Sequence, residues 1–220
     1  MEYKTVQTSK EAIEVLKRLR RLGRSDRAAL IFLTAFCKEF NEETLNWANR
    51  CLAIAEIMTR LAPKGQEDVW YLTGLIHRTA DVTGTGDKNV DRKIAASLIR
   101  KAGFTHDVIY CIEKYGAVKD PRDWGPLMTS LIFADSHVTK DGMIMTTEEC
   151  CALNSERGKS NPVCQACMYA RYFLSKEKRE PWFETAIGIL QREIKQKKTE
   201  RTTDARMIKE QIESGNFEPA

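Results

Sequence analysis

The chain has 220 residues, of which 42% are hydrophobic and 30% charged, with a mean hydropathy of −0.44. These values exclude wholesale disorder, and the length suffices for one substantial core or for one domain with a small appendage. The formal net charge of +4 is too small to indicate nucleic-acid binding by itself. Because no apolar run approaches the roughly 20 residues that span a bilayer and no secretion signal is present, we expect no membrane partner and a cytoplasmic location.

The composition and the hydrophobic periodicity predict an all-α fold. Glycine and proline are scarce, at 12 and 6 residues, whereas an all-β chain needs frequent turns. Apolar residues recur at helical intervals along most of the chain, and the polar residues 138–163 are the least regular part. The predicted helices span about residues 11–22, 28–40, 42–61, 69–78, 94–102, 108–115, 127–137, 164–175 and 181–198.

The positive charge is concentrated in residues 1–27, in and around the first predicted helix. Residues 1–27 carry eight Lys or Arg and four Asp or Glu, a surplus equal to the net charge of the whole chain. Such a helix can follow a phosphate backbone while tryptophans stack on bases, although a basic helix face is more often simply solvated. The candidate nucleic-acid-binding residues are Lys17, Arg18, Arg20, Arg21, Arg24 and Arg27.

Four of the seven cysteines form a cluster. Cys164 and Cys167 have the C-x-x-C spacing that lets two thiolates bind one tetrahedral ion, and the vicinal Cys150 and Cys151 lie upstream in a polar segment. We therefore expect a structural zinc site of these four cysteines that anchors the C-terminal helical segment. In a variant of this site, one vicinal cysteine does not bind and His137 takes its place. An iron–sulfur cluster, a redox pair or free thiols remain as alternatives.

The middle of the chain resembles the HD-domain superfamily of metal-dependent phosphohydrolases. The matching segments are 49–56, 72–78, 94–104 and 131–135, which agree in order and apolar pattern over nearly a hundred residues. The resemblance implies an all-α bundle in which a His, an adjacent His-Asp pair and a final Asp hold a divalent metal against a phosphate ester.

Two of the metal-ligand positions that this resemblance implies carry arginine. The first His position falls on Arg50, the His-Asp pair becomes His77-Arg78, and the final Asp is retained as Asp135. A further family His would fall near Asp87. A guanidinium group has no lone pair to donate to a metal, so an ordinary HD metal centre is not expected here.

These substitutions leave three interpretations open. Arg50 and Arg78, with Asp87 nearby, replace the positive charge of the metal and bind a phosphate or carboxylate without hydrolysing it. Alternatively, the site has closed around an ion pair between an arginine and Asp135. In the third interpretation a rearranged metal site survives, with His77 and Asp135 as catalytic residues. Its remaining candidate ligands are Asp81, Asp87 and His137.

We accordingly divide the chain into N-terminal helices with a basic face (1–43), an HD-like helical core (44–137), a cysteine-cluster segment with C-terminal helices (138–200) and a charged tail (201–220). The preferred functional hypothesis is a catalytically degenerate HD-like protein that binds a nucleotide, a nucleic acid or a protein partner. The alternatives are a divergent metal-dependent nucleotide phosphohydrolase and an interaction module with a sealed pocket.

Overall fold

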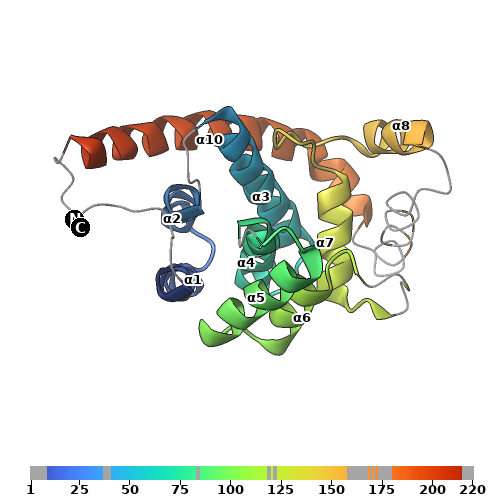
Figure 1. The fold of residues 1–220 in the computed structure, drawn as a ribbon. Coiled ribbons are helices and arrows are strands. Elements are labelled where there is room, and N and C mark those ends of the chain that lie inside the picture. Colours follow the sequence, from blue (N-terminus) through green and yellow to red (C-terminus); the bar gives the residue numbers. More distant parts are fainter. Residues whose placement is uncertain are drawn as a thin grey trace.

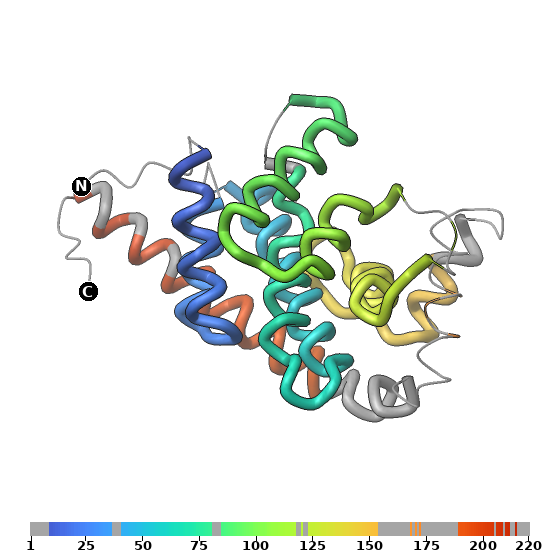
Figure 2. Tube along the Cα trace, turned by 90° about the horizontal axis from the view of Figure 1, so that it is seen from below, coloured from blue at the N-terminus to red at the C-terminus, as the bar shows by residue number. Residues whose placement is uncertain are grey.

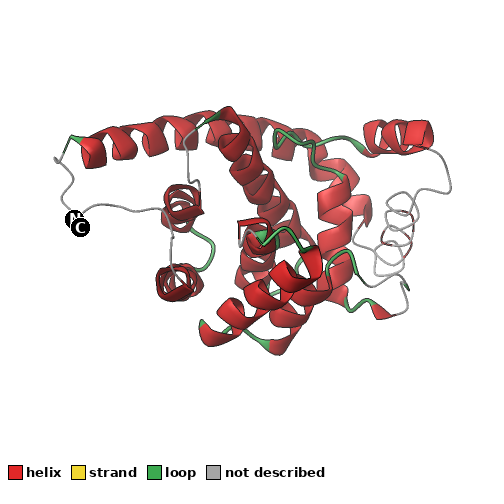
Figure 3. Cartoon of the chain, viewed as in Figure 1, coloured by secondary structure: helices red, strands yellow, loops and turns green. Residues whose placement is uncertain are grey.

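The structure, a computed structural model, describes residues 9–36, 41–82, 85–117, 120, 123–157, 168, 170, 172 and 180–214. Throughout these ranges the chain is helical or forms connecting loops, and the only β-pairing is an isolated bridge between Val138 and Ile144 (Figure 3). The all-α prediction is therefore confirmed. No helix within the described ranges is both long and apolar enough to cross a membrane.

The core is built around α3 (Glu42–Leu61), which runs through the middle of the molecule (Figure 1). Its most extensive partner is α4 (Glu67–Ile76), and the two helices approach closely because Gly74 has no side chain. A Cβ at Gly74 would lie only 2.7 Å from the Cα of Ala55. The middle of α3 is buried almost all round, as expected for a central helix.

Other helices surround this pair. α1 (Ser9–Leu22) and α2 (Asp26–Phe36) pack together on one side, and the turn η1 (Thr79–Val82) leads to α5 (Lys88–Lys101) and α6 (His106–Lys114) on another (Figures 1 and 2). α7 (Pro126–Ser136) packs against α3 and α6. These bounds agree with the predicted helices to within two residues, except that α5 begins six residues before its predicted start and α2 is described only to Phe36.

The C-terminal part of the chain differs from the prediction in two places. The segment predicted as least regular contains α8 (Thr147–Arg157), and the last helix, α10 (Glu180–Glu213), continues well past residue 198. A reciprocal cap begins α8, because the Thr146 amide donates to the Glu149 carboxylate at 2.7 Å and the Glu149 amide donates to the Thr146 hydroxyl at 3.1 Å.

α10 lies across α2 and α3 (Figure 1). Its buried Leu190 and Ile194 join the hydrophobic core, and Arg201 is also buried, at 7% exposure. The Arg201 guanidinium lies 3.4 Å from the buried carboxylate of Glu56 on α3 and 3.2 Å from the exposed carboxylate of Asp26 on α2. Lys197 Nζ approaches the same Glu56 carboxylate at 3.3 Å. The buried Arg201–Glu56 pair, together with the contacts of Asp26 and Lys197, thus attaches α10 to two early helices.

Candidate functional site

An ion pair between Arg50 and Asp135 joins α3 to the end of α7. Arg50 Nη2 donates to Asp135 Oδ1 at 2.9 Å and to the Asp135 backbone carbonyl at 3.2 Å, while Arg50 Nε donates to Oδ1 at 3.3 Å. Both side chains are mostly buried, at 15% and 25% exposure. Charge-assisted hydrogen bonds of this kind fix the relative position of the two groups. The predicted pairing of an arginine with Asp135 is thus what the structure contains.

Two further side chains complete the surroundings of Asp135. The hydroxyl of Tyr115, which follows α6, donates to Asp135 Oδ2 at 2.5 Å. His77, at the end of α4, is buried; its Nδ1 donates to the Gly74 carbonyl at 2.6 Å, because that oxygen can only accept. His77 Nε2 lies 3.8 Å from Asp135 Oδ1 and has no hydrogen-bond partner among the residues that the structure describes. Sequence analysis identified His77 and Asp135 but missed Tyr115.

The contacts on Asp135 favour its charged form. Burial by itself raises the pKa of this carboxyl, but contacts with His77, Arg50 and Tyr115 outweigh burial and hold the pKa well below its usual range. Since His77 Nε2 is beyond hydrogen-bond distance, we attribute most of the lowering to the close contacts of Arg50 and Tyr115. Burial and the neighbouring Asp135 carboxylate raise the pKa of the Tyr115 hydroxyl well above its usual value, so Tyr115 acts as a donor.

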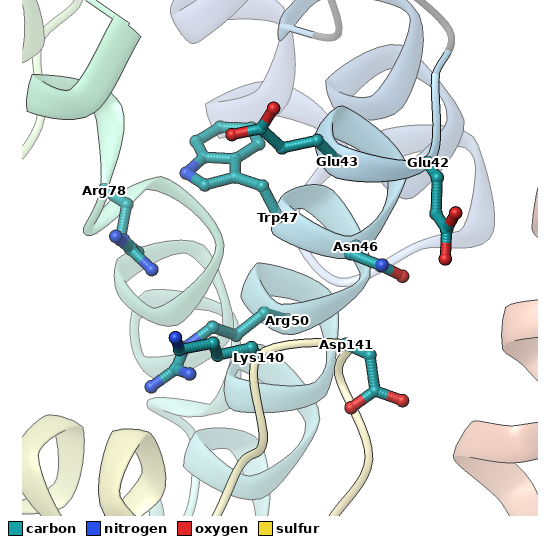
Figure 4. Close-up of a pocket in the computed structure, with 8 residues that line it drawn as sticks. All are labelled: Glu42, Glu43, Asn46, Trp47, Arg50, Arg78, Lys140 and Asp141. Carbon is teal, nitrogen blue, oxygen red and sulfur yellow. The ribbon is translucent and has the colours of Figure 1, made fainter.

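A cavity of about 590 Å³ opens beside this ion pair (Figure 4). Arg50 lines the cavity and also forms the ion pair with Asp135. Arg78 reaches the cavity from the segment that follows α4. The volume lies within the range of about 300–1,000 Å³ that is usual for small-molecule sites. The complete lining consists of Glu42, Glu43, Asn46, Trp47, Arg50, Arg78, Lys140 and Asp141.

The turn that carries Lys140 and Asp141 is held directly against α3. The Thr139 amide donates to the Met143 carbonyl at 2.8 Å, and Gly142 within this turn has a φ of +84°. A Cβ at Gly142 would lie 2.7 Å from the carbonyl carbon of Asn49, so only glycine permits this approach. On the outer side, Lys198 Nζ of α10 donates to the Asp141 carbonyl at 2.7 Å. The cavity wall therefore depends on both α3 and α10.

The residues at the implied HD ligand positions do not fit a catalytic metal. Arg50 occupies one carboxylate oxygen of Asp135 and Tyr115 occupies the other, and neither arginine can ligate a cation. Asp87 is exposed and caps α5, accepting from the amides of Asn89 and Val90. It is not among the residues that line the cavity.

The other two candidate ligands of a rearranged metal site are Asp81 and His137. The backbone of Asp81 lies in η1, but its side chain is outside the described residues. His137 is buried, stacks on Phe133 and directs its Nδ1 to the Phe133 carbonyl at 2.9 Å. Within the part of the chain that the structure describes, no group of three or more His, Cys, Asp or Glu residues is arranged to hold a metal ion.

The structure describes two of the four cysteines of the predicted metal site, Cys150 and Cys151. Cys150 is buried, and its thiol donates to the Ser136 carbonyl at 3.3 Å, whereas the neighbouring Cys151 is exposed on α8. The vicinal thiols thus face different surroundings, as adjacent residues on a helix do. Cys164 and Cys167 lie outside the described residues. The zinc site and its iron–sulfur alternative stay predictions.

The predicted basic helix face is partly engaged with the rest of the chain. Arg20 donates to the Gly103 carbonyl at 2.7 Å, Lys17 pairs with Glu14 at 2.8 Å, and Arg24 lies 3.9 Å from Glu56. These contacts compete with a phosphate backbone for the same donors. The remaining three candidates are exposed: Arg18, Arg21 and Arg27.

Sequence reasoning did not assign six of the eight lining residues to this cavity. Glu42, Glu43, Asn46 and Trp47 precede Arg50 on α3. The steps of three or four residues from Glu43 to Asn46 and Trp47, and from these two to Arg50, are the signal that places them on the same side of a helix. Lys140 and Asp141 had no such signal, because a loop brings them to the site. Comparisons of the chain with protein-family models, with curated proteins and with solved structures found no match.

Proposed function

We propose that this chain is a catalytically degenerate HD-like protein that binds a nucleotide in the cavity beside the Arg50–Asp135 ion pair and does not hydrolyse it. One observation carries the proposal. Arg50 and Arg78, the two positions at which arginine replaces an implied metal ligand, both line one open cavity. Guanidinium groups then supply the positive charge that a metal would supply to a phosphate.

The chemistry of the lining supports a phosphate group rather than an uncharged ligand. Arg78, Lys140 and Arg50 gather on one side of the cavity (Figure 4), where they present several N–H donors to one anion. Trp47 adds an aromatic surface within the same cavity, which suits a nucleobase or another flat ring. An open cavity of this size also argues against the sealed interaction module.

The state of Asp135 opposes hydrolysis. A phosphohydrolase of the implied kind needs this carboxylate to bind metal, but here both oxygens accept hydrogen bonds from Arg50 and Tyr115. Hydrolysis would require the Arg50 ion pair to break and would leave a buried guanidinium without its partner. Binding without turnover avoids this cost.

Calorimetric titration with nucleoside mono-, di- and triphosphates and with inorganic phosphate tests the proposal. We expect at least one nucleotide to bind, and we expect Arg78→Gln to weaken that binding by about tenfold or more, since a charge-assisted hydrogen bond is lost. Arg100→Gln is the matched control, because Arg100 is exposed on α5 and does not line the cavity. Equal affinity in the wild type and in Arg78→Gln would contradict the proposal.

The same nucleotides incubated with Mn²⁺ distinguish binding from hydrolysis. We expect no release of phosphate or nucleoside. Turnover that is abolished by Asp135→Ala would instead establish the divergent phosphohydrolase, because it would show that Asp135 can exchange Arg50 for a metal.

A further inference from the structure

Three basic and three acidic side chains line the cavity, and the acidic Asp141 adjoins the basic Lys140 on the 139–143 turn. Arg50, Arg78 and Lys140 line it together with Glu42, Glu43 and Asp141. Arg50 already faces Asp135 at 2.9 Å, and Asp141 faces Lys198 at 3.8 Å. A ligand that carried only negative charge would gain from the basic side and would be repelled by the acidic side. The lining is therefore complementary to a ligand with two different ends.

The acidic and basic ends are separated along α3. Glu43, Trp47 and Arg50 are spaced by four and then three residues, so they follow one side of the helix. At 1.5 Å per residue, the seven steps from Glu43 to Arg50 cover about 10 Å. Figure 4 shows the three basic side chains on one side of the cavity, with Glu43 beside the Trp47 ring and Glu42 farther away.

An aromatic side chain, Trp47, lines the middle of the cavity. Trp47 lies between the two ends, and its ring stacks on Phe32 of α2 with centroids 5.5 Å apart and an interplanar angle of 19°. This stacking holds the indole in place, so that it presents a fixed apolar surface to the cavity. A flat ring bound here has a phosphate-binding side at one end and carboxylates at the other.

We propose that the ligand is a nucleoside monophosphate whose base carries an amino group, with the phosphate at Arg78 and Lys140 and the amino group at Glu42 and Glu43. This inference rests on the proposed function and specifies its ligand. A carboxylate accepts hydrogen bonds from an amino group but repels the carbonyl oxygen that replaces it in an oxo base. A monophosphate also places less negative charge near the acidic end than a triphosphate does.

Matched nucleotide pairs test this inference by calorimetry. AMP and IMP differ in one amino group against one carbonyl oxygen, and so do CMP and UMP. We expect the amino member of at least one pair to bind about tenfold more tightly than its oxo partner, and AMP to bind more tightly than ATP. In Glu42→Gln/Glu43→Gln we expect the preference within the pair to fall to within about twofold, because an amide can donate as well as accept.

The controls separate this effect from helix destabilisation. Glu42 and Glu43 also stabilise the first turn of α3, as Glu148 does in α8, so Glu148→Gln removes a comparable charge away from the cavity. This variant should keep the full preference. Arg78→Gln should weaken both members of each pair equally, since it acts at the phosphate end.

The two proposals fail in different ways. If monophosphates bind but amino and oxo members are equal, if ATP binds more tightly than AMP, or if the preference survives in Glu42→Gln/Glu43→Gln, then the inference about the ligand is overturned and the proposed function stands. If none of the nucleotides binds, both proposals fail.

Discussion

At the scale of single residues, Arg50 decides the chemistry of the site. Its guanidinium occupies the carboxylate that the family resemblance assigns to a metal, and it also forms part of the cavity wall. The sequence showed that an arginine stands at this position, and from that both an ion pair and a ligand site could be anticipated as alternatives. The structure contains the ion pair beside an open cavity, so the pair forms as expected but does not close the site.

Asp135→Asn tests how much the ion pair stabilises the fold. The variant leaves the Arg50 charge mostly buried without its counterion, and we expect the free energy of unfolding at pH 7 to fall by about 2 kcal/mol. Because the pKa of Asp135 is lowered in the folded state, its stabilising contribution is present above the unfolded-state pKa of about 3.9 and is lost as the pH falls below that value.

Denaturation of both proteins between pH 7 and pH 2 measures this contribution. The difference in unfolding free energy between the wild type and Asp135→Asn should shrink as the pH falls below about 4. A difference that stays constant over this range would show that the charge of Asp135 does not contribute to stability.

Gly142→Ala tests the close approach of the 139–143 turn to α3. Alanine at this position is strained by the positive φ and also clashes with the Asn49 backbone. Gly65→Ala is a matched control, because Gly65 has a φ of +82° and nothing within 4 Å of an added Cβ. In chemical denaturation we expect Gly142→Ala to be less stable than Gly65→Ala by about 1–3 kcal/mol. Equal losses would mean that the turn moves aside without cost.

At the scale of elements, the helices with strong apolar periodicity were predicted well and the polar ones were not. α3 begins at Glu42 and ends at Leu61, as its apolar stripe and the following Pro63 indicated. The start of α8 had a signal in the capping-box spacing of Thr146 and Glu149, which the sequence interpretation did not use. Its weakly amphipathic, polar sequence gives little other indication of a helix.

The length of α10 was underestimated for a different reason. The residues after 198 are mostly charged, and charge runs are typical of solvated tails. Arg201, however, is buried and contacts Glu56 and Asp26, which belong to helices near the other end of the sequence. These partners are 145 and 175 residues away from Arg201 in the sequence, so no local sequence pattern indicates the contacts. They became apparent only in the three-dimensional structure.

Arg201→Met tests whether this anchor holds α10 in place. Without the Arg201 guanidinium, the negative charge of the buried Glu56 carboxylate is less well neutralised, so we expect the free energy of unfolding to fall by about 2–3 kcal/mol. Hydrogen exchange should show faster opening of α10, and Arg206→Met, at an exposed position on the same helix, should show no such change. Adding Glu56→Gln to Arg201→Met should recover part of the stability, since the buried carboxylate is then removed as well.

At the scale of the whole molecule, the fold class followed from composition and periodicity, but the site did not follow from either. From the order of the helices we expected Arg50, His77 and Asp135 to lie at one site. The structure places these three side chains together. Tyr115, Lys140 and the contact of Lys198 with Asp141 come from helix ends and loops whose positions depend on tertiary packing. Local sequence patterns carry no information about such contacts.

The anchoring of α10 has a consequence for the order in which the chain can fold during synthesis. Glu56 and Asp26 leave the ribosome long before Arg201 is made, and until then the Glu56 carboxylate has no guanidinium from α10 to face. A nascent chain that has completed α1 to α7 therefore holds a charge at the surface that α10 will later cover. α10 can dock on α2 and α3 only after Arg201 has been synthesised. A pause in translation shortly before Arg201 would therefore prolong the time during which the Glu56 carboxylate is uncovered.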